Sequence, residues 1–183
     1  MTPDQVSEAL SHLAKVIAEN TPDMTQTVAA TALAVVRDRI QDTGVDSKGV
    51  KFKGYSTKEI PAFFYTGKSL KKLKKDEFGE DALQQNDMLS YKEWRELNNL
   101  QTDHVDLTFT GDMWRKTAII SAGLAPEGYV VSIGGNTREA QDKINYASDK
   151  YGNILSVSEK EEKNLTEDYD EMLDKLIAES GLG

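Results

Sequence analysis

The sequence predicts an α+β fold in which a mostly antiparallel sheet packs against two long helices, with extended loops between the elements. Three observations lead to this prediction. Residues 2–44 carry apolar side chains at the three- and four-residue steps of a helix. Tyr129–Ile133 is rich in the aromatic and β-branched residues that favour strands. Residues 159–179 carry a second helical apolar stripe, which follows a serine that can cap the helix.

Two helices are expected at the N-terminus, because Thr-Pro-Asp occurs at residues 2–4 and again at 21–23. Each threonine can cap free backbone N–H groups, and proline suits the first helical position. The second helix is expected to end at Gly44, which can adopt the left-handed C-cap conformation. We therefore expect residues 1–20 to form an N-terminal helix, which a neighbouring subunit could bind, and residues 21–183 to form a single α+β domain. The two apolar stripes are Val6, Leu10, Leu13 and Ile17, and then Met24, Val28, Ala32, Val35, Val36 and Ile40.

Four strands are expected, near residues 60–66, 105–110, 113–120 and 129–134, although a short helix would also fit 113–120. Residues 136–151 could form a helix or a long loop. Ser90 and Glu93 form a capping box before a short helix that reaches about residue 100, with Trp94 and Leu97 on its buried side. Ser158 or Ser156 is expected to cap the last helix, which runs to about Glu179. The apolar stripe of that helix is Leu165, Tyr169, Met172, Leu173, Leu176 and Ile177.

The composition limits the kinds of site that the chain can hold. Its 183 residues include no cysteine, which excludes disulfides, thiolate zinc sites and thiol nucleophiles. The net charge is −9, and residues 101–183 carry 16 acidic side chains against 8 basic ones. Such a surface repels phosphate, so we expect no sequence-specific reader of nucleic acid. No apolar stretch is long enough for a membrane span, and the first residues lack the pattern of a secretory signal.

Lysines gather in two segments that are expected to be loops. Residues 43–59 are rich in turn-forming glycine, aspartate and serine. Gly67-Lys68-Ser69 resembles the end of a phosphate-binding loop, but that motif requires a glycine where this chain has Ala62. We therefore expect no nucleotide and no other cofactor. The lysines either lie on a solvated loop or contact an acidic neighbour or a DNA end. The interface candidates are Lys51, Lys53, Tyr55, Lys68, Lys71, Lys72, Lys74 and Lys75.

No residue pattern indicates a catalytic site. The chain has two histidines, and one of them, His104, lies between Asp103 and Asp106. Such a group could bind a metal ion or transfer protons, although it more often caps the end of a strand. No serine has the context of a strained nucleophile elbow, and the acidic residues of the last helix have no histidine partner. We therefore expect no catalytic residues and no metal ligands.

Four short segments carry a resemblance to a known family. They are residues 39–44, 91–97, 107–113 and 151–155, and the resemblance extends over roughly residues 35–178. In these segments the chain resembles the neck proteins of tailed double-stranded-DNA phages, a family also called head–tail joining, minor tail or tail-completion proteins. It departs from the commoner pattern at residues 150–153, where many relatives carry Glu-x-Gly-Thr and this chain has Lys-Tyr-Gly-Asn.

The resemblance implies a structural virion protein that is assembled in the host cytoplasm and is not an enzyme. It would form a homo-oligomeric ring at the head–tail junction, completing or joining the tail. Its partners would be portal, adaptor or other neck proteins and the tail tube or tail proteins, with DNA passing through the ring without sequence-specific binding. Three alternatives remain. They are a tail terminator or other non-neck virion component, a phosphate- or nucleotide-handling enzyme that uses Gly67-Lys68-Ser69, and a soluble adaptor that never enters the particle.

Overall fold

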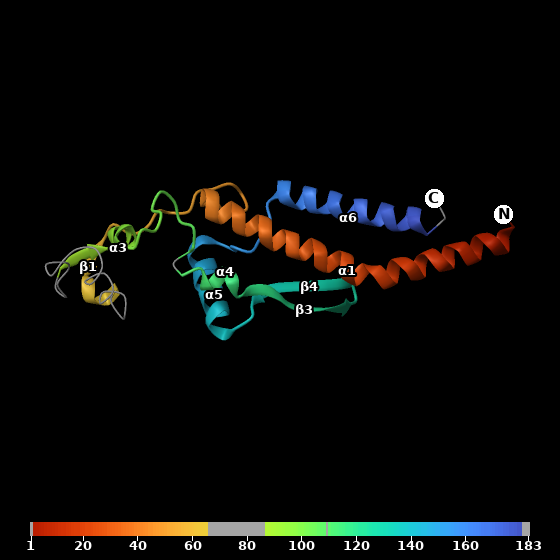
Figure 1. Ribbon diagram of the computed structural model, residues 1–183, viewed down its shortest axis with the longest axis horizontal. Coiled ribbons are helices and arrows are strands. Elements are labelled where there is room, and N and C mark those ends of the chain that lie inside the picture. Colours follow the sequence, from red (N-terminus) through yellow and green to blue (C-terminus); the bar gives the residue numbers. More distant parts are fainter. Residues whose placement is uncertain (1, 66–86, 109, 181–183) are drawn as a thin grey trace.

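The computed structural model describes residues 2–65, 87–108 and 110–180 and shows an elongated α+β protein (Figure 1). We call its larger part the body; it contains the helices α1, α4, α5 and α6 and the β3–β4 hairpin. The part that we call the small lobe contains β1, the short 3₁₀ helix η1, β2 and α3. The bounds are α1 Pro3–Thr43, β1 Glu59–Pro61, η1 Ala62–Tyr65, β2 Met88–Ser90, α3 Tyr91–Leu97, α4 Asp112–Arg115, β3 Thr117–Ala125, β4 Gly128–Gly135, α5 Arg138–Tyr151 and α6 Glu159–Glu179.

The N-terminal residues form one helix of 41 residues, so the predicted break at Thr21 and Pro22 is wrong. The predicted ends are confirmed, because Thr2 caps the helix and Gly44 ends it with φ 63° and ψ 38°. Thr21 does not act as a cap; its hydroxyl donates to the Ile17 carbonyl oxygen at 2.8 Å. Pro22 removes one helical hydrogen bond. The helix bends midway along its length (Figure 1), which is the expected response to an internal proline.

The two halves of α1 differ in what covers them. After the bend, Met24, Val36 and Ile40 are buried, as their stripe predicts. Before the bend, Val6 is 42% exposed and Leu10 is 61% exposed. The second half packs against the hairpin and α6, whereas most of the first half extends past the rest of the chain (Figure 1).

The single, mostly antiparallel sheet that the sequence predicts is not formed. The described residues contain two separate two-stranded antiparallel sheets, β1–β2 and β3–β4. β4 confirms the strand that was predicted at 129–134. The predicted strand 60–66 ends at Pro61 and continues as η1. Residues 113–120 divide between the helical turn α4 and β3, because Gly111 adopts φ 73° and starts that turn.

The described residues of the predicted strand 105–110 do not form a strand, and Val105–Thr108 follows an irregular path. Leu107 has φ 53°, which interrupts an extended backbone. The Asp106 side chain also points inward, where Arg95 binds its carboxylate. Residues 136–151 were predicted to form either a helix or a long loop. The helix is confirmed, since α5 covers most of this segment and is capped by Thr137.

The core of the body forms where α1, α4 and α5 meet. Its buried side chains are Val36, Ile40, Met113, Trp114, Ile144, Ala147 and Ile154. The capping box at Ser158 and Glu161 starts α6, as predicted, and Glu161 also forms an ion pair with Arg39 of α1. Leu165 is buried against α1, and the rest of the α6 stripe is half-buried. The small lobe has its own core of Ala62, Leu89 and Trp94, and Ser90 caps α3 as predicted.

Candidate functional site

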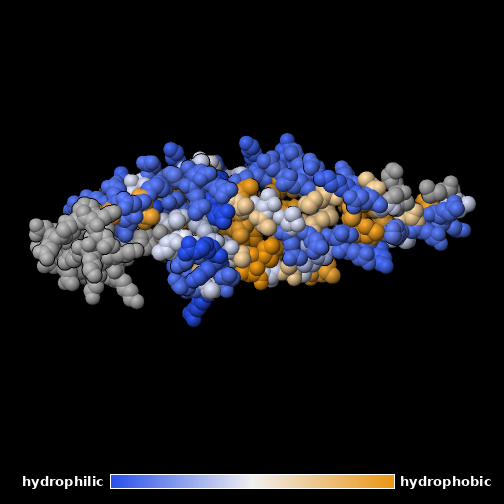
Figure 2. Space-filling model, viewed as in Figure 1, coloured by the Kyte–Doolittle hydropathy of each residue, from blue (hydrophilic) through white to orange (hydrophobic). Residues whose placement is uncertain are grey.

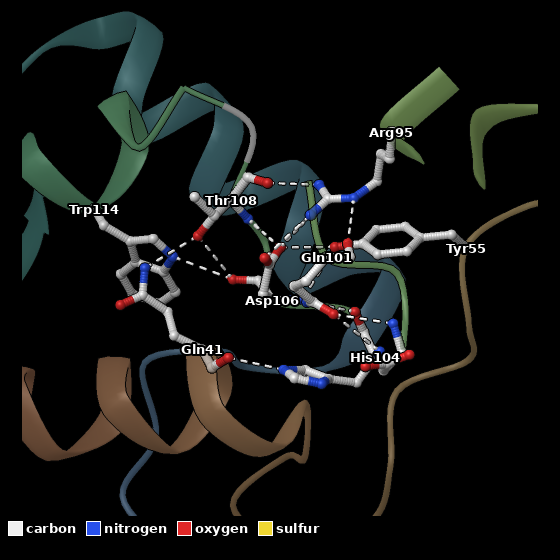
Figure 3. A network of polar contacts seen from close by, with 9 residues as sticks. Gln41, Tyr55, Arg95, Gln101, His104, Asp106, Thr108 and Trp114 are labelled. Carbon is white, nitrogen blue, oxygen red and sulfur yellow. Dashed lines mark hydrogen bonds and ion pairs between the residues drawn. The ribbon is translucent and has the colours of Figure 1, made fainter. Parts of the chain in front are cut away.

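A network of polar side chains joins the small lobe to the body (Figure 3). Its centre is an ion pair between Arg95 of α3 and Asp106, whose side chains are 1% and 11% exposed. Arg95 follows Trp94 on the buried side of α3, so the fold of that helix carries a charged group into the interior. A charge this well buried is tolerated only when all its hydrogen-bonding groups have partners.

Each nitrogen of the Arg95 guanidinium has an acceptor. Its Nη2 lies 3.1 Å from each carboxylate oxygen of Asp106. Its Nη1 donates to the Thr108 carbonyl oxygen at 2.5 Å, and its Nε donates to the Gln101 carbonyl oxygen at 3.1 Å. Arg95 therefore fixes the irregular segment 101–108 from one side. This is why that segment holds a defined path without belonging to a sheet.

Tyr55 closes the network from the other side. Its hydroxyl donates to Asp106 Oδ1 at 2.7 Å and accepts the Asp106 backbone N–H at 3.1 Å. The Arg95 guanidinium carbon lies 4.2 Å from the centre of the Tyr55 ring, in a cation–π contact. Burial, together with the hydrogen bond to Asp106, raises the pKa of the Tyr55 hydroxyl well above its ordinary value. Tyr55 is therefore held in the junction between lobe and body.

His104 and Gln41 connect the network to the C-terminal end of α1. His104 Nε2 lies 2.7 Å from the Gln41 carbonyl oxygen, which can only accept, so this ring nitrogen donates. The Gln41 side chain donates to Thr108 Oγ1 at 3.0 Å. A Cβ atom on Gly44 would lie 2.7 Å from the His104 Cβ, so a glycine is needed where the imidazole passes. No group of three histidine or acidic side chains among the described residues could hold a metal ion.

A cleft of about 660 Å³ opens beside this network, between the small lobe and α5. Its wall is unusually rich in tyrosine, since five of the chain's seven tyrosines line it. Tyr65 and Tyr91 stack on Trp94 with ring centres 5.6 and 5.7 Å from it. The five tyrosines are Tyr55, Tyr65, Tyr91, Tyr146 and Tyr151.

Charged side chains on the wall of the cleft are paired with near neighbours. Lys143 donates to Glu139 at 2.6 Å, and this bond lowers the pKa of the Glu139 carboxyl. Asp112 accepts from Arg115, which lowers the pKa of the Asp112 carboxyl in the same way. The Lys150 ammonium lies 5.0 Å from the centre of the Tyr151 ring, and its hydrogen bond to Tyr151 raises its pKa. The pairs on this wall are ion pairs and aromatic contacts, which bind and position groups, and none is a nucleophile with an adjacent base.

The structure describes three of the eight predicted interface residues. Lys51 and Lys53 are exposed in the segment that follows α1. Tyr55 is half-buried and hydrogen-bonded, as described above. The candidates Lys68, Lys71, Lys72, Lys74 and Lys75, together with the Gly67-Lys68-Ser69 motif, lie outside the described residues.

The pairing of Arg95 with Asp106 was not predicted. A signal is present at Asp106, a charged residue inside the apolar run that predicts a strand. A second signal was Arg95, which directly follows a buried tryptophan on a seven-residue helix. Neither signal indicates its partner, because residues 95 and 106 are brought together by the irregular path between them.

Comparison of the chain with known proteins finds no relative. No family model matches the chain, and neither the curated proteins nor the solved structures contain a match. In the ranges 2–65, 87–108 and 110–180, no helix has the length and apolar character needed to cross a membrane.

Proposed function

We propose that this chain is a structural virion protein of a tailed phage, which oligomerises into a ring at the head–tail junction and completes or joins the tail. The proposal rests on the resemblance in residues 39–44, 91–97, 107–113 and 151–155. The observation that carries it furthest is the amount of apolar surface that this elongated chain leaves uncovered at two separate places. Proteins that act alone rarely expose contiguous apolar surface of this kind.

The first uncovered place is the N-terminal half of α1, where Val6 and Leu10 are 42% and 61% exposed. The second is the β3–β4 hairpin, where Ile120, Leu124 and Val130 are 50%, 88% and 39% exposed. Figure 2 shows hydrophobic surface over both places, with hydrophilic surface over much of α6. Two separated apolar surfaces on one elongated chain suit a subunit that makes more than one contact in an assembly.

The charge of α6 supports a passage for DNA that does not bind it. This helix carries nine acidic residues and three lysines. A ring whose lumen was lined by such faces would repel the phosphate backbone and would release no counter-ions on contact. The genome could then slide through the ring without being held.

The test is to image the purified chain by negative-stain electron microscopy and to analyse purified phage particles by mass spectrometry. We expect closed rings of uniform size in the images and the protein in mature particles. Cryo-electron microscopy of those particles would distinguish a ring at the neck from a terminator at the far end of the tail. A chain that stays monomeric at every concentration and is absent from particles would refute the proposal.

A further inference from the structure

The β3–β4 hairpin differs from the rest of the chain in its charge. Charged residues make up 29% of the sequence, yet residues 117–137 contain one, Glu127, which lies in the turn. Soluble proteins usually place charged side chains on the exposed edges of strands, because those edges would otherwise pair with other chains. The hairpin lacks this protection.

Neither edge of the hairpin is paired with a further strand among the described residues. β3 and β4 pair with each other. Gly135 shows which backbone groups point outward, since its N–H is bonded by the Gln141 side chain and not by β3. By the alternation of an antiparallel ladder, Val131 on β4 and its partner Ala122 on β3 also direct backbone groups outward.

The distal half of the hairpin has free space at three positions. A Cβ atom added at Gly123 or at Gly128 would meet no atom within 4 Å. The side chain of Leu124, between these two residues, is 88% exposed. The other end of β4 is different, because α5 packs against Gly135. α1 also packs against both strands, and its Gln26 donates to the Tyr129 hydroxyl. The hairpin therefore has open space on its face near Gly123 and Gly128, and at the proximal end of β4 the Gln141 side chain occupies the outward N–H of Gly135.

We infer that the hairpin is the contact between subunits, in which the β3 edge of one copy pairs with the β4 edge of the next copy. This inference rests on the proposed function and adds the surface that forms the ring. The partner is a second copy, because this chain offers one uncharged edge on each side of the same hairpin, and each can complete the other. Elsewhere two copies with a net charge of −9 repel each other.

Pairing of β3 with β4 between copies also favours a closed ring. Each β3–β4 contact between copies satisfies two edges and leaves one open edge at each end of the growing assembly. Only a closed ring leaves no open edge. A pairing of β3 with β3 would instead give an isologous dimer that leaves both β4 edges open.

Because the chain has no cysteine, single-cysteine variants can test the contact directly. Ala122→Cys and Val131→Cys are prepared as separate proteins of different mass, mixed and oxidised. We expect a disulfide between the two different proteins, and little crosslinking in either protein alone. The absence of the mixed product would overturn the inference, as would efficient crosslinking of Ala122→Cys with itself.

A charged residue introduced at the edge of the hairpin provides a second test of the contact. Leu124→Lys is expected to raise the concentration at which the assembly dissociates by at least tenfold, because it places an ammonium group at an edge that must be covered. Val50→Lys is the matched control, since Val50 is 60% exposed and lies outside the hairpin. Circular dichroism of both variants checks that they fold. Equal effects of the two variants would overturn the inference.

These outcomes are separable from those of the proposed function. Rings that form without the mixed disulfide would remove the hairpin contact and leave the virion role standing. A mixed disulfide in a protein that is absent from particles would do the reverse.

Discussion

The body and the small lobe both enclose a buried tryptophan, but they are held together in different ways. In the body, Trp114 belongs to a cluster of seven buried residues drawn from α1, α4, α5 and the segment before α6. In the small lobe, Trp94 is joined by two further buried residues and by flanking tyrosines. The strands of the lobe are three residues long, whereas those of the body hairpin have nine and eight.

This difference indicates how the lobe keeps its place. The described residues of the lobe include three buried apolar side chains, whereas the core of the body has seven. The lobe is joined to the body through Arg95, which reaches across to Asp106 and the segment 101–108. The parts of the body are therefore joined mainly by apolar contacts, whereas the described part of the lobe is joined to the segment 101–108 by a buried ion pair.

Among the tests of this comparison, the largest loss of stability is expected when Arg95 is replaced. Arg95→Ala leaves Asp106 as a buried carboxylate without its ion partner, and such changes cost about 3–5 kcal/mol. We expect the free energy of unfolding in urea to fall by that amount, with early loss of protection from hydrogen exchange in β1, β2 and α3.

Arg115→Ala is the matched control. Arg115 forms an ion pair with Asp112, but its side chain is 65% exposed, so its removal should cost about 1 kcal/mol or less. If both variants lose the same small amount of stability, the junction does not hold the lobe.

A second prediction concerns the body. Ile40 is fully buried, and Ile40→Ala should lower the free energy of unfolding by about 2–5 kcal/mol. Because the body is the larger core, hydrogen exchange should rise throughout the chain. Leu89→Ala removes a similar volume from the lobe, and its effect on exchange should remain in β1, β2 and α3. An equally global effect of Leu89→Ala would show that lobe and body unfold as one unit.

The sequence predicted those features that depend on neighbouring residues. The caps at Thr2, Ser90 and Ser158 and the C-cap at Gly44 were predicted and are confirmed. Each depends on side-chain or backbone geometry within about four residues, which the sequence displays directly.

Features that depend on distant contacts were not predicted. Thr21 and Pro22 have the local chemistry of a helix start, but the helix passes through them, with Met24 and the residues beyond packed on the body. Val105–Thr110 has the composition of a strand, but Asp106 is held by Arg95 and Tyr55. In both cases contacts from elsewhere in the chain outweigh the local preference.

The smallest expected effect concerns Tyr55 and the pH. Its raised pKa means that the folded protein holds the hydroxyl proton more tightly than the unfolded chain does. The associated stability is therefore complete below a pH of about 10 and is lost as the pH rises further. Tyr55→Phe removes the hydroxyl and its bond to Asp106, which should cost about 0.5–3 kcal/mol near neutral pH.

The two effects together give a pH signature. The wild type loses the Tyr55 contribution at alkaline pH, and Tyr55→Phe has none to lose. The difference between their melting temperatures should therefore be largest near pH 7 and should shrink as the pH rises above about 10. Thermal melts followed by circular dichroism at several pH values measure it. A difference near zero at every pH would show that Tyr55 supports the junction by packing its ring against Arg95, a contact that phenylalanine retains.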